Sequence, residues 1–142
     1  MNNLLEVTVD MANPRMQYTS SLRNLPTIKM DYIPPFGDGD GYLPLELTLM
    51  SLATCSGSAV AAMLRKMGKT VADMHVTATG ERRSEHPLSF HTITLNFALS
   101  SPDASNIEME KAITLSEESI CPVWAMLKGN VAIKTNYSIH SS

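Results

Sequence analysis

Two cysteines are the residues of this sequence best suited to chemistry. Cys55 lies inside a long uncharged segment, and Cys121 is followed directly by Pro122. A thiolate is a strong nucleophile, and two thiols that meet in a fold can form and break a disulfide. Cysteine is also among the most buried residue types, so two buried, inert thiols are the alternative on chemistry alone. The elements that hold the cysteines must therefore be considered first.

The segment around Cys55 predicts one long helix. Leu43–Gly68 has Pro44 near its start and Gly68 at its end, as is typical of a helix that begins at a proline and ends before a glycine. Residues 47–64 carry no charge, and apolar residues recur on every side of the predicted helix, which favours burial. The length also suits a membrane span. The serines and threonines of the segment, together with the strands predicted elsewhere, favour a core helix instead.

The Cys121-Pro122 pair predicts an interruption in a second helix. Residues 107–128 have a helical pattern, but a proline inside a helix costs about 3 kcal/mol. We therefore expect a break near residue 120, after which Pro122 begins a short last helix with Cys121 as its cap. Free N–H groups at that helix start would lower the pKa of the Cys121 thiol. Cys55, in apolar surroundings in mid-helix, is expected to have a raised pKa and to need a nearby cation before it reacts.

Alternating apolar and polar residues predict strands on both sides of the Cys55 helix. The candidates are residues 4–9, 15–20 and 27–33 before it and 71–81, 90–99 and 131–139 after it. With two helices the order is β-β-β-α-β-β-α-β, an α+β fold with two central helices and an antiparallel sheet. A chain of 142 residues fits a single domain spanning 1–142. A helix that is apolar on every side needs more cover than one small sheet gives, which suggests a second subunit.

Composition excludes several function classes. The net charge is −3 and the 11 basic residues are scattered, which disfavours nucleic acid or an anionic membrane as a partner. The N-terminal sequence has no basic run before an apolar core, so we expect no signal peptide and a cytoplasmic location. The four histidines show no metal-ligand spacing and no Gly-x-Ser-x-Gly motif is present. The serines around Cys55 are therefore interpreted as small packing residues.

The cysteines and their surroundings resemble those of the OsmC/Ohr family of organic hydroperoxide reductases, in particular its less-characterised OsmC-like branch. The similarity extends over about residues 15–139. The matching segments are Pro44-Leu45-Glu46-Leu47, Ser51-Leu52-Ala53-Thr54-Cys55, His86-Pro87, Phe90 to Leu95, Lys111-Ala112-Ile113, Leu115-Ser116-Glu117-Glu118, Cys121-Pro122 and Gly129-Asn130.

The resemblance implies a fold and a reaction. The fold would be an intertwined homodimer with the helices at its centre and the sheets outside. Cys55 would be the peroxidatic cysteine, whose thiolate reduces an organic hydroperoxide to an alcohol and becomes a sulfenic acid. Cys121 would resolve the sulfenic acid as a disulfide, which a lipoyl-type dithiol would reduce. No metal, haem or flavin is implied.

The resemblance also implies an arginine near the N-terminus that holds the thiolate, and a glutamate directly after the helix-opening proline that holds the arginine. Here Leu45 follows Pro44, and the glutamate comes one residue later as Glu46, which moves it about 100° round a helix. Arg15 is our candidate for the arginine, ahead of Arg23. The predicted catalytic set is therefore Cys55 and Cys121 with Arg15 and Glu46.

Two further interpretations stay open at this point. The displaced glutamate favours a non-enzymatic OsmC-like dimer that responds to redox conditions or binds an apolar small molecule. A purely structural dimer with buried thiols is the third possibility. The retained cysteine pair favours the peroxidase.

Overall fold

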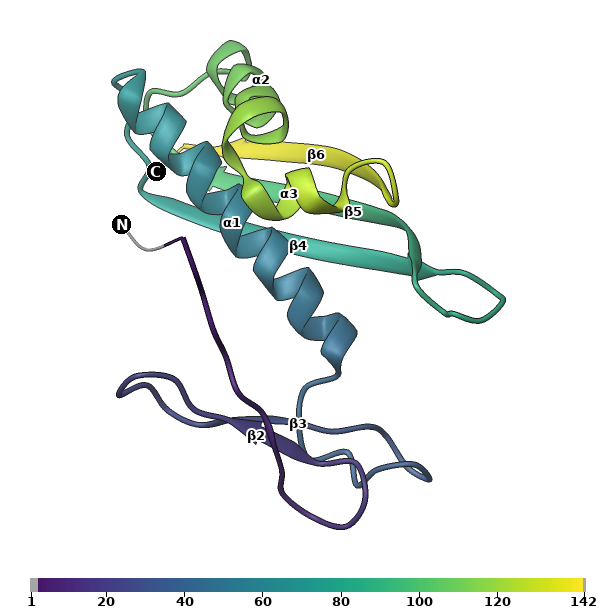
Figure 1. The fold of residues 1–142 in the computed structure, drawn as a ribbon. Helices are drawn as coiled ribbons and strands as arrows, with labels where there is room; N and C mark the ends of the chain where they lie inside the picture. The colour runs from purple at the N-terminus through teal and green to yellow at the C-terminus, as the bar shows by residue number, and fades with distance from the viewer. Residues whose placement is uncertain (1–2, 142) are drawn as a thin grey trace. The chain divides into compact units, whose positions relative to one another are not determined.

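The computed structural model describes residues 3–141 of the chain, which form an N-terminal unit up to Thr48 and a C-terminal unit from Leu49 onward. Each unit has its own three-stranded sheet (Figure 1). Helix α1, Pro44–Lys66, begins in the first unit and continues into the second. The α+β class and the order of three strands, a helix, two strands, a helical segment and a last strand are confirmed. That residues 1–142 form one domain stays a prediction.

The N-terminal sheet consists of very short strands. They are β1 Asp10–Met11, β2 Tyr18–Ser20 and β3 Ile28–Met30, paired in that order and antiparallel. The strand predicted at residues 4–9 is wrong, because those residues lie outside the sheet. The apolar pattern gave no information on pairing. Because Asp10 pairs with Thr19 in an antiparallel register, residues 4–8 would have to pair with residues 21–25, which do not form a strand.

The C-terminal sheet is built from long strands, and its topology corrects the prediction of an antiparallel sheet. Strands β4, Asp73–Arg82, and β5, Phe90–Ser100, form the predicted antiparallel hairpin. Strand β6, Ala132–His140, pairs with β5 in parallel. The chain runs from β5 to β6 through a helical segment (Figure 1). Two parallel strands require a long connection of this kind.

The helical segment is broken as the sequence predicts. Helix α2, Asn106–Leu115, starts with a capping box formed by Ser105 and Glu108, which satisfies two free N–H groups. It runs into a π-helical turn, η1, Ser116–Ile120. Helix α3, Pro122–Leu127, then starts at the predicted proline. The predicted helix over 107–128 is therefore three consecutive helical elements.

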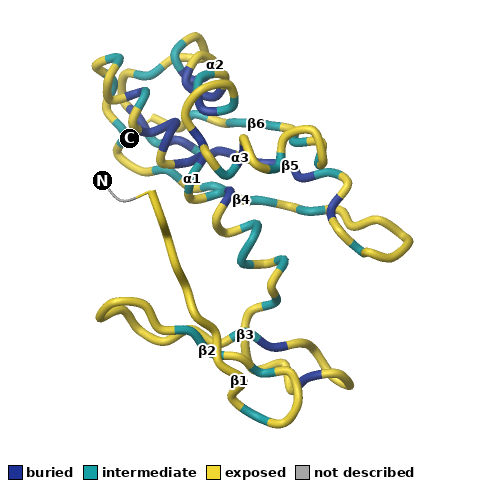
Figure 2. The backbone as a smooth tube through the Cα atoms, viewed as in Figure 1, coloured by how far each residue is buried: buried dark blue, intermediate teal, exposed yellow. Residues whose placement is uncertain are grey.

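One core unites α1, α2 and α3 with one face of the C-terminal sheet, and its buried residues are dark blue in Figure 2. From α1 it includes Leu52, Val60 and Leu64, each without exposed surface. The other contributors are Ile93, Leu95, Phe97 and Leu99 of β5, Met109, Ala112 and Ile113 of α2, and Trp124 of α3. Within one chain α1 is not buried on every side as expected, since Met50 is 45% exposed. By length and composition alone α1 could cross a membrane, as core helices of soluble proteins also could.

Candidate active site

The two cysteines come together although they lie on different helices. Cys55 lies near the middle of α1 and is half-buried. The Cys121 thiol and the backbone N–H of Val123 lie close enough to the Cys55 thiol to shift its pKa. Both cysteines are in the free thiol form. The packing of α1 against the start of α3 thus creates a dithiol pair from residues far apart in the sequence.

Cys121 occupies the cap position that the sequence predicts for it. Its Sγ accepts hydrogen bonds from the Trp124 backbone N–H, at 3.4 Å, and from the Ser56 hydroxyl, at 3.5 Å. Its own N–H donates to the Ser116 carbonyl across η1, at 3.0 Å. The residue is only 3% exposed. Cys121 is therefore held firmly from both sides, with two donors directed at its sulfur.

Burial raises the pKa of the Cys55 thiol above its usual value. The Val123 N–H opposes this effect, because a hydrogen bond to sulfur favours the thiolate, and the neighbouring Cys121 adds to the raising effect. The direction agrees with the expectation for a thiol in apolar surroundings. A Cys55 thiolate at neutral pH would thus need a positive charge in addition to its surroundings in the C-terminal unit.

The structure places Arg15 and Glu46 in local contacts within the N-terminal unit. Arg15 lies in the turn between β1 and β2, and its guanidinium donates to the Asp38 carboxylate and to the Pro35 carbonyl. The Glu46 carboxylate accepts the Leu43 N–H at 2.8 Å, as a glutamate in the first turn of a helix commonly does. The catalytic roles of Arg15 and Glu46 stay predictions.

Sequence reasoning missed two polar residues that the structure emphasises. Ser56, interpreted as a packing residue, is wholly buried and directs its hydroxyl at Cys121. Asp31 is 1% exposed and accepts the N–H groups of Tyr32, Asp38 and Asp40, which organises the following glycine-rich loop. The position of Asp31 before a loop dense in proline and glycine was a usable signal. Nothing in the local sequence distinguishes Ser56 from Ser58.

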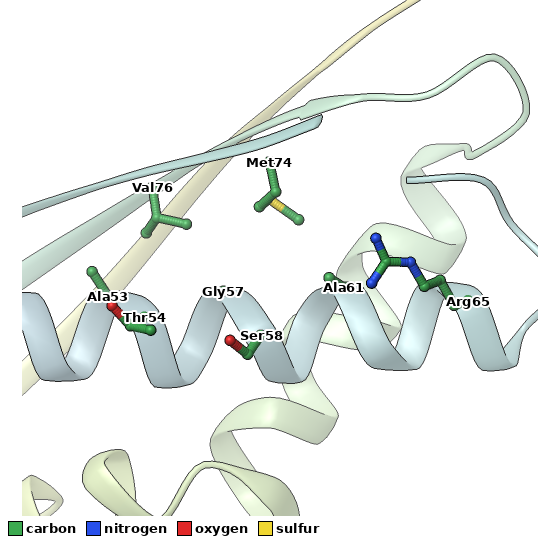
Figure 3. A pocket seen from close by; sticks show the side chains of 8 residues that line it. All are labelled: Ala53, Thr54, Gly57, Ser58, Ala61, Arg65, Met74 and Val76. Carbon is green, nitrogen blue, oxygen red and sulfur yellow. The ribbon is translucent and has the colours of Figure 1, made fainter. Parts of the chain in front are cut away.

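An open cavity of about 440 Å³ lies between α1 and β4 and is separate from the dithiol pair. Figure 3 shows Met74 and Val76 facing the helix and Arg65 near one end. The full lining is Ala53, Thr54, Gly57, Ser58, Ala61, Arg65, Met74 and Val76, so neither cysteine belongs to it. Among residues 3–141 no three His, Cys, Asp or Glu side chains gather as metal ligands would.

Comparison with known sequences identifies a family and a set of relatives that this chain resembles. Residues 37–136 match the family described as OsmC-like protein. This range contains Cys55, Cys121 and Glu46 but not Arg15. The chain is 35% identical to protein YhfA of Escherichia coli K12 over 96 residues, which are 68% of this chain and 72% of YhfA.

Solved structures with the same fold cover almost the whole chain. A hypothetical protein from Aquifex aeolicus VF5 has a TM-score of 0.85 at 26% identity, covering 99% of both chains. An OsmC-like protein from Mycoplasma pneumoniae has a TM-score of 0.82 at 22% identity, again covering 99% of both chains. The organic hydroperoxide resistance protein OhrB of Bacillus subtilis has a TM-score of 0.68 at 16% identity, covering 94% of this chain and 98% of OhrB. At such low identities the last two likenesses establish the fold alone.

Proposed function

The chain belongs to the OsmC-like protein family, and from this premise we propose that it is a thiol-dependent peroxidase that reduces organic hydroperoxides. One observation carries the proposal: two free thiols, from α1 and from the cap of α3, lie near each other, and Ser56, the residue next to Cys55, hydrogen-bonds to the Cys121 sulfur. Such a pair can pass through a sulfenic acid and a disulfide without a metal, haem or flavin. The family membership and the fold shared with a hydroperoxide resistance protein support a peroxide-related redox role.

Cys55 is the peroxidatic residue in this proposal, because it is the more accessible thiol of the pair. Its thiolate attacks the terminal oxygen of the hydroperoxide, the O–O bond breaks, and the alkoxide takes up a proton and leaves as an alcohol. Sulfur loses two electrons and becomes a sulfenic acid. Cys121 then displaces hydroxide to form the disulfide, and the hydroxide takes up a proton to give water.

A dithiol of the lipoyl type returns the pair to the thiol state. Its first thiolate attacks the disulfide, and its second displaces the enzyme from the mixed disulfide, so the dithiol itself is oxidised to a cyclic disulfide. A dithiol suits the task because its second thiol is already held nearby. This reductant is consistent with a cytoplasmic location.

Arg15 is proposed to supply the positive charge that Cys55 needs, with Glu46 as its carboxylate partner. The proposal gives a function to a cation that now pairs with Asp38 at the surface, where both side chains are about half exposed. Surface ion pairs of this kind contribute little to stability. Little free energy is therefore lost when Arg15 leaves Asp38 for another partner.

The working unit is proposed to be a homodimer. Several large apolar side chains of the N-terminal unit are exposed, among them Leu4 at 79%, Leu5 at 98% and Phe36 at 67%. Exposed apolar surface of this extent is unusual for a protein that works alone and favours an interface. Met50 of α1, 45% exposed, would also gain cover.

Turnover with purified protein tests the proposal. Cumene hydroperoxide and dihydrolipoamide should be consumed in equal amounts when the protein is added. The loss of hydroperoxide and the oxidation of dihydrolipoamide are measured separately. Cys55→Ser should abolish consumption. Cys121→Ser should still allow one oxidation of Cys55. It should not sustain turnover when the dithiol is limiting, because the disulfide that the dithiol reduces cannot form. Consumption that survives Cys55→Ser would contradict the proposal.

A second function is favoured by the raised pKa of Cys55. A thiol that is mostly protonated reacts slowly, which suits a redox-responsive protein whose disulfide forms only under sustained oxidation. The same experiment separates the two functions. Slow formation of one disulfide without catalytic consumption of hydroperoxide would support the redox-responsive protein.

A further inference from the structure

Ser56 follows Cys55 in the sequence, but its side chain hydrogen-bonds to the other cysteine, Cys121. Its hydroxyl donates to Cys121 Sγ at 3.5 Å, and the residue has no exposed surface. A buried hydroxyl placed against a sulfur, with water excluded, interacts more strongly than it would at the surface. One turn of α1 thus holds both the thiol proposed to meet the peroxide and a donor for its resolving partner.

The sulfur of Cys121 is surrounded by donors. Besides Ser56, the Trp124 N–H donates to it at 3.4 Å, and the Cys55 thiol lies beside it. Cys121 is itself fixed by its N–H bond to the Ser116 carbonyl and is 3% exposed. Donors from two different helices, α1 and α3, therefore fix the position of the Cys121 sulfur.

We infer that Ser56 is a positioning residue that holds the Cys121 sulfur where it can resolve the Cys55 sulfenic acid and can leave when the disulfide is reduced. The inference rests on the proposed peroxidase cycle and adds to it the roles of the two sulfurs in each step. Ser56 does not touch the hydroperoxide in this cycle; it acts through Cys121.

In the resolving step the Cys121 thiolate attacks the Cys55 sulfur, the S–S bond forms and the S–O bond breaks. Hydroxide leaves and takes up a proton. On reduction the dithiol thiolate attacks the Cys55 sulfur, the S–S bond breaks, and its electron pair returns to Cys121. Attack occurs at Cys55 because Cys121 is buried and Cys55 is the more accessible sulfur.

Ser56→Ala tests this role, with Ser58→Ala as the matched control, since Ser58 is an exposed serine of the same helix. After one equivalent of cumene hydroperoxide, Ser56→Ala should form the Cys55 sulfenic acid at the wild-type rate. Disulfide formation should be about tenfold slower or more, as expected for one lost hydrogen bond to a charged group. Sulfinic acid should therefore accumulate when excess hydroperoxide is present. Ser58→Ala should behave as wild type.

A second measurement needs no peroxide. In a Cys55→Ser background, the thiolate absorbance of Cys121 near 240 nm is titrated with and without Ser56→Ala. The midpoint should move to higher pH when the hydroxyl is removed, and Ser58→Ala should leave it in place. If Ser56→Ala shifts the titration midpoint of Cys121 but hydroperoxide does not oxidise the wild-type thiols, the proposed peroxidase is contradicted and the interaction of Ser56 with Cys121 is supported.

Unchanged disulfide formation together with an unchanged Cys121 titration would overturn the inference. Loss of stability in urea as the only effect of Ser56→Ala would assign the residue a packing role and would overturn it as well. The rate of disulfide formation and the titration are the readouts that a purely structural serine would not change.

Discussion

The contact between α1 and β4 at Gly57 offers a stability test of how the Cys55 helix is seated. A Cβ atom on Gly57 would lie 2.9 Å from Cγ2 of Val76, which is shorter than real carbon–carbon contacts. Valine is stiff at its first side-chain torsion, so its methyl group cannot easily move away. Glycine is therefore required at position 57 because Val76 of β4 leaves no room for a Cβ atom, and not because of the helix conformation.

Two opposing terms set the effect of Gly57→Ala on the free energy of unfolding. Alanine is about 1 kcal/mol better than glycine inside a helix. Forcing a methyl group against Val76 at this short distance costs about 1–3 kcal/mol. We expect the clash to win, with a net loss of about 1 kcal/mol and a fall in melting temperature of about 3 °C.

A Val76→Ala background removes the obstructing methyl group and should reverse the sign. There Gly57→Ala should raise stability by about 1 kcal/mol, so the double-mutant cycle should show a coupling of about 2 kcal/mol. The four proteins are compared by urea unfolding monitored through Trp124, which is buried in the same unit. A stabilising effect of Gly57→Ala in the wild-type background would refute the reasoning, because it would mean that the helix is not pressed against the sheet at Gly57.

Two other substitutions probe the charges. Arg15→Gln should shift the reaction of Cys55 with hydroperoxide to higher pH: burial raises the pKa of the Cys55 thiol, and without the proposed cation the rate should keep rising about tenfold per pH unit through neutrality. Arg23→Gln is the control, and identical rate–pH profiles for wild type and Arg15→Gln would exclude Arg15. Burial would raise the pKa of Asp31, but hydrogen bonds from backbone N–H groups outweigh it and lower the pKa below its usual value. Its ionised form therefore stabilises the fold above about pH 4, the unfolded value, and this contribution disappears as the pH falls through the folded value. Asp31→Asn should flatten that part of the dependence of melting temperature on pH, and parallel curves for the two proteins would contradict this.

The helices were the most predictable part of the fold, because their boundaries are encoded locally. Pro44 begins α1 and Pro122 begins α3, and a proline at a helix start has a local physical cause. The same cause allowed the cap position of Cys121 to be predicted. The raised pKa of Cys55 followed from the apolar composition of its helix.

Strand pairing was predicted less well, because it depends on partners distant in the sequence. The alternation in β6 says that Ala132–His140 is a strand but not which direction it takes beside β5. The apolar residues at 4–9 likewise gave no indication that they lie outside the sheet. Ser56 could not be distinguished as a donor to Cys121 for the same reason, since the contact joins two separate helices.

One measurement tests the central claim most directly. The reduced protein is mixed with one equivalent of cumene hydroperoxide, its free thiols are counted, and its cysteine peptides are identified by mass spectrometry without reduction. We predict loss of both thiols, a single disulfide that links Cys55 to Cys121, and no thiol loss in Cys55→Ser. Two intact thiols after this treatment, or oxidation of Cys121 in the absence of Cys55, would contradict a peroxidase that works through this pair.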